Sequence, residues 1–177
     1  MQTVQLKNKD LISIIGTFMD QLQSVDHKNY PYQKRDITWE YATGNEYLAH
    51  MQGKKVDGFP EKTHGIDLAR FTPPNLSSAL KQLDSDLINW SGSRNNAVKM
   101  LYPASGYIGW HHNANAAGYN MLLSWSKGGT GFFRYQDPIT KEIITLNDTP
   151  GWTCKVGYFG NFQEHDRIIW HCAGAPK

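Results

Sequence analysis

The sequence predicts a mainly β fold with helices in its N-terminal part, an α+β arrangement. Beyond Gly92, short runs rich in β-branched and aromatic residues alternate with turn residues, and no helical period interrupts them. Consecutive short strands without crossover helices favour an antiparallel sandwich or a small barrel. The 177 residues suit one hydrophobic core. We therefore expect a single domain over residues 1–177, with a helical support region at 1–92 and the β core at 93–177.

Two segments of the N-terminal part have helical spacing of apolar residues. Residues 10–24 place Leu11, Ile15 and Leu22 on one face, and Asp10 suits the first turn. Residues 75–90 follow two prolines and carry a second apolar stripe. Between these helices, DITWEYAT at 36–43 alternates like a strand, whereas GKKVDGFPEKTHG at 53–65 fits no regular element.

The second half contains seven predicted strands. The separators between them, such as PASG, KGGT and NDTPG, are rich in glycine, proline and short polar residues that favour turns. The predicted strands are AVKMLY (97–102), YIGWHH (107–112), YNMLLSWS (119–126), GFFRYQ (131–136), KEIITL (141–146), WTCKVGYFG (152–160) and RIIWHC (167–172).

Composition and charge exclude several classes of protein. The formal charge is only +2, and the basic residues are scattered, so the chain lacks the electrostatic pattern of a dedicated nucleic-acid binder. No window approaches a membrane span, and the N-terminus does not resemble a signal peptide, so we expect a cytoplasmic protein without membrane association. Cys154 and Cys172 are too few for a disulfide framework or a cysteine-based zinc site.

Histidines stand at the ends of two predicted strands. His111 and His112 end one strand, and His171 lies 60 residues after His111 near the end of another. A non-haem Fe(II) site needs two imidazoles and an oxygen donor on one face of the metal, with open positions opposite. The three histidines at these strand ends are therefore candidate metal ligands.

The phrases GYIGWHHNAN, GGTGFF and IIWHC together resemble the Fe(II)/2-oxoglutarate-dependent dioxygenases, whose ligands form an H-x-D pair and a distal histidine. IGWH is similar to the AlkB-type members, and the GFFRY and GW phrases are similar to members carried by marine bacteriophages. The resemblance covers residues 97–173 and implies a double-stranded β-helix, or jelly roll, with Fe(II) and 2-oxoglutarate as cofactors. It assigns His111, Asn113 and His171 to the metal, and Tyr102, nine residues before His111, to 2-oxoglutarate.

The chain departs from the family pattern at two places. Asn113 replaces the aspartate, and a neutral amide binds hard cations more weakly than a carboxylate does. The family also has a basic residue after the distal histidine that anchors 2-oxoglutarate, whereas this sequence stops at Lys177, so we expect the last strand to be missing. A sequence cut from a longer reading frame would explain this, or another residue would be the anchor. By location, the candidates are Arg134, Lys155 and Arg167.

Three functional interpretations arise from these residues. The first is an oxygenase that uses dioxygen and 2-oxoglutarate to hydroxylate or demethylate an unknown prime substrate, which can be a small molecule, a protein side chain or a nucleobase. The second is a catalytically inactive jelly-roll binding module, and the third is a cupin-like metal enzyme that does not use 2-oxoglutarate. A different register, His112-x-Ala114, resembles the halogenase form of the family, in which a halide takes the place of the carboxylate.

Overall fold

The computed structural model describes residues 1–23, 32 and 36–177. These residues form two compact units, and the chain passes between the units several times. The first unit contains residues 1–5, 36–65 and 102–177, and the second contains residues 6–23, 32 and 66–101. The expected division at residue 92 therefore does not coincide with the boundary between the units.

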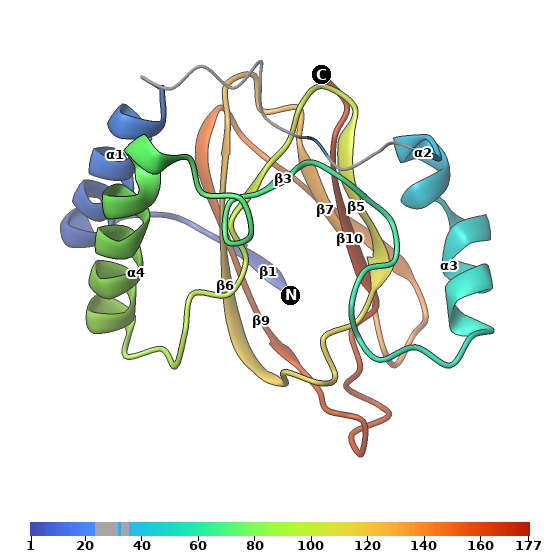
Figure 1. Ribbon diagram of the computed structural model, residues 1–177. Helices are drawn as coiled ribbons and strands as arrows, with labels where there is room; N and C mark the ends of the chain where they lie inside the picture. The colour runs from blue at the N-terminus through green and yellow to red at the C-terminus, as the bar shows by residue number, and fades with distance from the viewer. Residues whose placement is uncertain (24–31, 33–35) are drawn as a thin grey trace. The chain divides into compact units, whose positions relative to one another are not determined.

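The second unit is built around a pair of helices. Its elements are α1 (Lys9–Gln23), β3 (Ile66–Asp67), the short 3-10 helix η1 (Pro74–Leu76), α4 (Ser77–Ser91) and β4 (Met100–Leu101). The two long helices lie side by side (Figure 1), and β3 pairs with β4 in antiparallel orientation. Leu22, Leu76 and Leu80 belong to the buried cluster of this unit. Both predicted helices are thus confirmed, although Ser24, the last residue of the first prediction, lies outside the described residues.

The first unit holds the longer strands. Its elements are β1 (Gln2–Val4), α2 (Trp39–Ala42), α3 (Asn45–Gln52), β2 (Thr63–His64), β5 (Gly106–His111), β6 (Gly118–Ser126), β7 (Phe132–Gln136), β8 (Ile143–Asn147), β9 (Gly151–Phe159) and β10 (His171–Ala175). Among the described residues, one sheet has the order β2-β5-β10-β7-β8 and the other has the order β1-β9-β6. All pairings are antiparallel, so the predicted mainly β class is confirmed.

The two sheets of the first unit face each other across a shared core. Phe133 and Tyr135 come from β7, whereas Phe159 comes from β9, and all three belong to one buried cluster. Leu122 of β6 and Leu146 of β8 pack against this cluster. The face of the β5-β10-β7 sheet that contacts this cluster is its inner face.

A second cluster covers the opposite, outer face of the same sheet. Trp110 of β5 and Cys172 of β10 pack there against Tyr47, Leu48 and Met51 of α3. The ribbon shows α2 and α3 on this side of β5 and β10 (Figure 1). The sheet therefore separates two distinct environments, and successive residues of a strand alternate between them.

One element prediction is wrong. The segment DITWEYAT, expected as a strand, contains α2, because Thr38 caps the helix and its hydroxyl oxygen accepts a hydrogen bond from the backbone N–H of Tyr41 at 3.3 Å. The turn also buries Ala42 and Thr43 completely. The seven predicted strands are all present, but AVKMLY is reduced to the two residues of β4, and the last strand begins only at His171.

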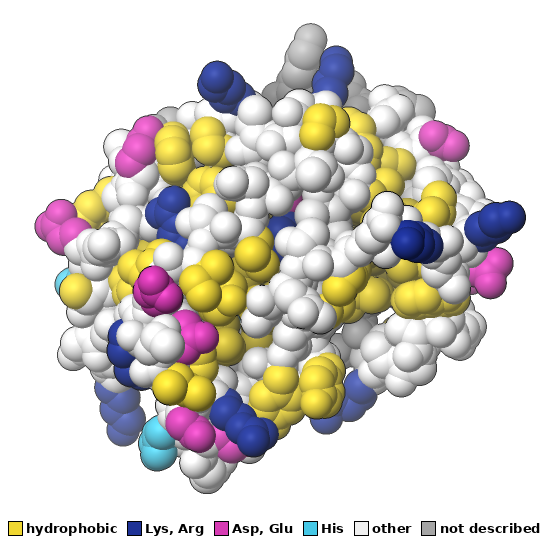
Figure 2. Space-filling view, turned by 180° about the vertical axis from the view of Figure 1, so that it is seen from behind, with side chains coloured by type: hydrophobic (Ala, Val, Ile, Leu, Met, Phe, Trp, Pro, Cys, Tyr) yellow, Lys and Arg dark blue, Asp and Glu magenta, His cyan; other side chains and the backbone are white. Residues whose placement is uncertain are grey.

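The surface agrees with the scattered charge of the sequence. On the face in Figure 2, acidic and basic side chains are scattered, in places next to one another, and hydrophobic side chains lie between them. No helix within the described ranges has the length and apolar character that a membrane crossing requires.

Candidate metal centre

A β-bulge in β5 aims His111 toward the inner face. His171 pairs with His111, but Ala173 pairs with Ile108, so Gly109 and Trp110 together stand opposite one residue of β10. An extra residue of this kind reverses the alternation of a strand. Ile108 and His111 therefore share the inner face although they are three positions apart, while Trp110 lies in the cluster on the outer face.

Glycine at position 109 is required by this bulge. A Cβ at that position would come within 3.0 Å of both the Lys62 carbonyl oxygen and a ring carbon of Tyr47. The backbone N–H of Gly109 donates to the same Lys62 carbonyl at 2.8 Å. The bulge is therefore held against the segment before β2, and a larger side chain would push the strand away from it.

His111 and His171 form a buried pair at one end of the sheet. They are direct cross-strand partners, their ring centroids lie 4.2 Å apart, and their planes are inclined by 56°. Only 7% of His111 and 5% of His171 are exposed. Phe133 and Phe159 lie against the imidazole of His171, with ring centroids 5.4 and 4.7 Å away. The structure thus brings together the two imidazoles that the sequence singled out.

The backbone determines which nitrogen of each imidazole carries the proton. Nδ1 of His111 lies 2.9 Å from the carbonyl oxygen of Gly109, and Nδ1 of His171 lies 2.9 Å from that of Ile169. Because a carbonyl oxygen only accepts, each Nδ1 must donate its proton. In a neutral ring this leaves the lone pair on Nε2, the arrangement by which proteins orient histidine ligands of metals.

Burial keeps both rings neutral. Desolvation lowers the pKa of His111 to about 4, although its hydrogen bond to Gly109 opposes the shift. Desolvation, followed by the neighbouring His111, lowers the pKa of His171 well below its ordinary value. Two neutral imidazoles with free Nε2 lone pairs are the state that a divalent metal ion needs.

The spacing of the two rings also suits a shared metal ion. At a metal–nitrogen distance of about 2.1 Å, two imidazoles at about 90° around one ion have ring centroids about 4.5 Å apart. The observed separation is 4.2 Å. The residues present therefore fit two adjacent positions of a metal centre.

Within the described part of the chain, no third side chain of the usual ligand types joins the two histidines. Among the described residues, no group of three or more histidine, cysteine, aspartate or glutamate side chains could hold a metal ion. Asn113, two residues after His111, is half-buried in the turn that follows β5. Its backbone carbonyl oxygen accepts a hydrogen bond from the N–H of Ala116 at 2.8 Å. Its role as an oxygen ligand stays a prediction.

His112 does not join the pair. Its ring lies edge-on against Trp170 and Phe162, with centroids 4.7 and 5.5 Å away, and its Nδ1 accepts from Ala114 N–H at 3.3 Å. These contacts separate it from the inner face, so the geometry does not support the His112-x-Ala114 register.

Arg134, a predicted cofactor-binding residue, is not brought to the histidines. Cys172, its cross-strand partner on β10, belongs to the outer-face cluster. The guanidinium donates to the carbonyl oxygen of Thr43 at 2.7 Å and to the hydroxyl of Thr145 at 3.0 Å, and it lies over the ring of Phe132. Alternation along β7 places its neighbours Phe133 and Tyr135 on the inner face instead.

Lys155 is the basic residue that lies inside the core of the first unit. It is completely buried, and its cross-strand partner Leu122 packs against the inner cluster. Its ammonium group forms an ion pair with Asp148 and donates to the hydroxyl of Ser124 at 3.4 Å. Arg167, in contrast, is exposed and pairs with Glu164 at 3.6 Å. The sequence contained one signal for this arrangement, a lysine in the middle of an apolar strand.

Tyr102 is half-buried, just before β5, and burial raises its pKa above the usual range. The same pKa is raised further by Cys172 and Asp148, so the phenol stays protonated. A protonated phenol can donate a hydrogen bond, as the predicted contact with 2-oxoglutarate requires. The contact of Tyr102 with this cosubstrate stays a prediction.

A cavity that the sequence does not indicate lies next to His112. The segment at 53–65, which fitted no regular element, supplies most of its lining, and Phe162 supplies the remainder. No periodic pattern marks such a segment, because its residues are brought together only by the docking of loops.

Comparison with protein-family models, with curated proteins and with solved structures finds no match for this chain.

Proposed function

We propose that this protein is an Fe(II)/2-oxoglutarate-dependent oxygenase with a double-stranded β-helix core, which hydroxylates or demethylates a substrate. The observation that carries the proposal is the buried pair His111 and His171, neutral, oriented by backbone carbonyls and spaced for one metal ion. Each imidazole binds a backbone carbonyl oxygen through Nδ1, which leaves Nε2 as the atom that can bind a metal ion.

The strand pairing supports a jelly roll. β7 pairs with β8, β6 with β9, and β5 with β10, so the three pairs are nested around the β7–β8 turn. A long antiparallel ribbon rolled onto itself into two facing sheets has this nested order, which is the plan of jelly-roll domains. The rolling brings the end of β5 beside the start of β10, and with them the two histidines.

In this proposal the chain's own residues have separate roles. His111 and His171 would hold the metal through Nε2, and the amide oxygen of Asn113, or a water in its place, would be the third ligand. Bound Fe(II) with 2-oxoglutarate would supply the activation of dioxygen. Phe133 and Phe159, packed beside His171, keep bulk water away from the metal.

Lys155 is our candidate for the residue that binds the distal carboxylate of 2-oxoglutarate. It is buried among residues of the inner core, and its ammonium group already binds a carboxylate, that of Asp148. An incoming carboxylate would take over part of this interaction, since an ammonium group offers three donors. Arg134 is not proposed for this role, because its guanidinium binds Thr43 on the outer face.

The first experiment measures metal binding and turnover separately. Purified protein is titrated with Mn(II), and a second sample is incubated with Fe(II), ascorbate and 2-oxoglutarate while succinate is measured. We expect about one equivalent of metal and succinate above background, both lost in His111→Ala. His165→Ala is the matched control, because His165 is exposed and lies outside the pair. Metal binding without succinate from 2-oxoglutarate would favour the cupin-like enzyme.

The inactive binding module has one observation in its favour, the absence of a three-residue metal group of the usual ligand types among the described residues. If the wild-type protein holds less than about a tenth of an equivalent of Mn(II), Ni(II) or Fe(II), the oxygenase proposal fails and this alternative stands.

The second experiment tests Lys155. Removing one partner of a buried ion pair leaves a costly unpaired charge, so the variant changes both residues, Lys155→Met with Asp148→Leu. We expect Mn(II) binding to be retained and the affinity for 2-oxoglutarate, measured by calorimetry, to fall at least about tenfold. Arg134→Gln should leave this affinity unchanged. If Arg134→Gln lowered the affinity for 2-oxoglutarate and the Lys155→Met, Asp148→Leu variant did not, the distal carboxylate would bind Arg134 on the outer face.

A further inference from the structure

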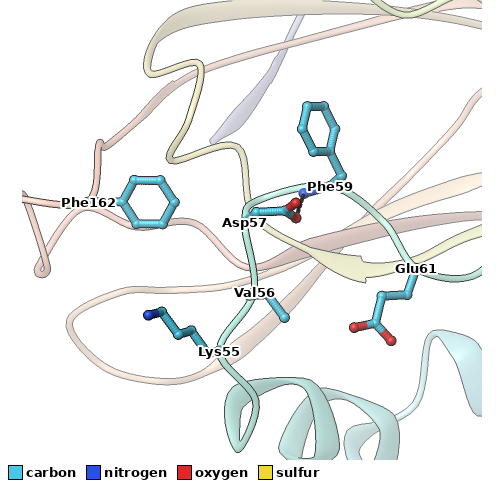
Figure 3. A pocket seen from close by; sticks show the side chains of 6 residues that line it. All are labelled: Lys55, Val56, Asp57, Phe59, Glu61 and Phe162. Carbon is cyan, nitrogen blue, oxygen red and sulfur yellow. Dashed lines mark hydrogen bonds between the residues drawn. The ribbon is translucent and has the colours of Figure 1, made fainter.

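A cavity of about 670 Å³ lies next to the turn that follows His111. Its lining residues are Lys55, Val56, Asp57, Phe59, Glu61 and Phe162 (Figure 3). The volume is within the range of pockets that hold small molecules, about 300–1,000 Å³. Nothing in the proposed metal centre uses these side chains.

Two contacts join the lining of the cavity to the turn that follows β5. At Gly58, in the middle of the lining segment, a Cβ would meet the Asn115 side chain at 2.6 Å and the His112 carbonyl oxygen at 3.0 Å. On the other side, the ring of Phe162 lies edge-on against His112, with centroids 5.5 Å apart. The lining of the cavity is thus in contact with His112, the residue that follows His111.

Two of the residues that line the cavity are exposed phenylalanines. Phe59 is 62% exposed and Phe162 is 41% exposed, although both are large apolar side chains. In Figure 3 the ring of Phe162 extends toward the segment that carries Asp57 and Phe59. Such rings gain hydrophobic and stacking energy when a planar apolar group covers them. They therefore favour a ligand with an aromatic ring.

The charges of the lining narrow the class of ligand. Glu61 forms an ion pair with Lys54 at 2.9 Å, whereas the Lys55 ammonium makes no interaction with any described residue. The carboxylate of Asp57 accepts only a long hydrogen bond, 3.4 Å, from the N–H of Phe59 among the described residues. One cation and one anion are thus available within the same lining. Two carboxylates and one lysine also make the lining a poor site for a polyanion such as single-stranded nucleic acid.

We infer that this cavity binds a small zwitterion with a planar apolar ring, of the class of the free aromatic amino acids. The ligand ring contacts Phe59 and Phe162, its carboxylate binds Lys55, and its ammonium group binds Asp57. If the proposed oxygenase function holds, this ligand is a candidate for the prime substrate, and that role rests on the proposed function. The binding of the ligand to the cavity does not depend on that function.

The test compares three probes that differ by one charge. Metal-free protein is titrated by calorimetry with L-tryptophan, with tryptamine, which lacks the carboxylate, and with indole-3-propionate, which lacks the ammonium group. We expect tryptophan to bind about tenfold more tightly than either analogue, as the loss of one charge-assisted hydrogen bond implies. Lys55→Gln should abolish the advantage over tryptamine, and Asp57→Asn the advantage over indole-3-propionate.

The aromatic walls are tested with matched alanine variants. Phe59→Ala and Phe162→Ala should each weaken tryptophan binding several-fold, whereas Phe71→Ala should not, because Phe71 is similarly exposed but belongs to the other unit. All three side chains are exposed, so the variants should unfold at the wild-type temperature. Equal affinity for the three probes, binding unaffected by Phe162→Ala, or tighter binding of an oligothymidylate than of tryptophan would overturn the inference.

The two proposals fail independently. Succinate formation without tryptophan binding would support the oxygenase proposal and contradict the proposed ligand. Tryptophan binding by a protein that binds no Mn(II) would support the proposed ligand and contradict the oxygenase proposal. Faster succinate formation in the presence of tryptophan would connect the cavity to the metal centre.

Discussion

The two faces of the β5-β10 sheet differ in what they bury. The outer face holds Trp110 and Cys172 in an apolar cluster, and the indole N–H of Trp110 donates to the Gly44 carbonyl oxygen at 3.0 Å. The inner face holds His111 and His171 among phenyl rings, with their Nε2 atoms directed away from the backbone that binds Nδ1. Neighbouring residues of the same strands thus belong to an apolar cluster on one face and to the proposed metal site on the other.

This difference shows how a bulge lets one strand present adjacent side chains to opposite faces of a sheet. Trp110 is completely buried and His111, its neighbour in the chain, is 7% exposed. The bulge places the two side chains on opposite faces of the sheet. Substitutions on the outer face should change the free energy of unfolding. Substitutions on the inner face should change metal binding and the response to pH.

The largest effect is expected for Trp110→Ala on the outer face. Removal of a fully buried indole leaves a cavity and an unpaired carbonyl, and such substitutions cost about 3–5 kcal/mol. Urea denaturation followed by circular dichroism measures this change. Trp125→Ala is the matched control, because Trp125 is 38% exposed and should lose much less. A similar loss in both variants would contradict the role assigned to the outer cluster.

The inner face should make the metal-free protein sensitive to acid. Burial lowers the pKa of His111 to about 4 and that of His171 well below its ordinary value, whereas histidines of an unfolded chain titrate near about 6.5. Between these values the unfolded chain binds more protons, so the free energy of unfolding decreases as the pH falls. For His111 we expect a loss of about 1 kcal/mol between pH 7 and pH 5.5.

Urea denaturation at the two pH values measures this loss. His111→Gln should show a smaller decrease than the wild type, and His165→Gln should show the same decrease as the wild type. An unchanged decrease in His111→Gln would mean that His111 is not the buried neutral group described here.

The smallest effect is expected at Tyr47 on the outer face. Its hydroxyl is the buried side-chain polar group that lacks a hydrogen-bond partner within the described part of the chain. Tyr47→Phe should therefore raise the free energy of unfolding by up to about 1 kcal/mol at pH 7. Burial, followed by the nearby Glu61, also raises the pKa of Tyr47 to about 12. Above pH 10 the unfolded chain loses this proton first, so the wild type should lose stability with rising pH more steeply than Tyr47→Phe.

Parallel urea titrations at pH 7 and pH 10.5 measure both parts of this prediction. Tyr119→Phe is the control, because Tyr119 is 91% exposed. A destabilised Tyr47→Phe would show that the hydroxyl makes a favourable contact after all.

Local pattern was sufficient for much of the fold. The helices at α1 and α4 and the seven strands of the second half follow from apolar spacing and turn residues, which act over a few neighbouring positions. The strand prediction for residues 36–43 was wrong because the alternation of apolar residues favours a strand less strongly than the cap at Thr38 and the burial of Ala42 favour a helix. Propensity decides such short segments poorly when tertiary contacts compete with it.

For the candidate site, the sequence identified His111 and His171 but not what surrounds them. Their selection depended on residue type and on the IGWH phrase, whereas their 4.2 Å separation depends on the pairing of β5 with β10. Arg134 was chosen by position along the chain, and the face to which it points could not be read without the register of β7.

The sequence alone determined the mainly β class and the two histidines, because hydrophobic periodicity and residue chemistry are local properties. Only the tertiary structure decided that the bulge at Gly109 turns His111 inward, that Lys155 and Asp148 meet inside the core, and that Phe59 and Phe162 share a cavity. Each of these depends on contacts between residues that are distant in the chain or on a shift of strand register by one residue, and neither leaves a periodic pattern in the sequence.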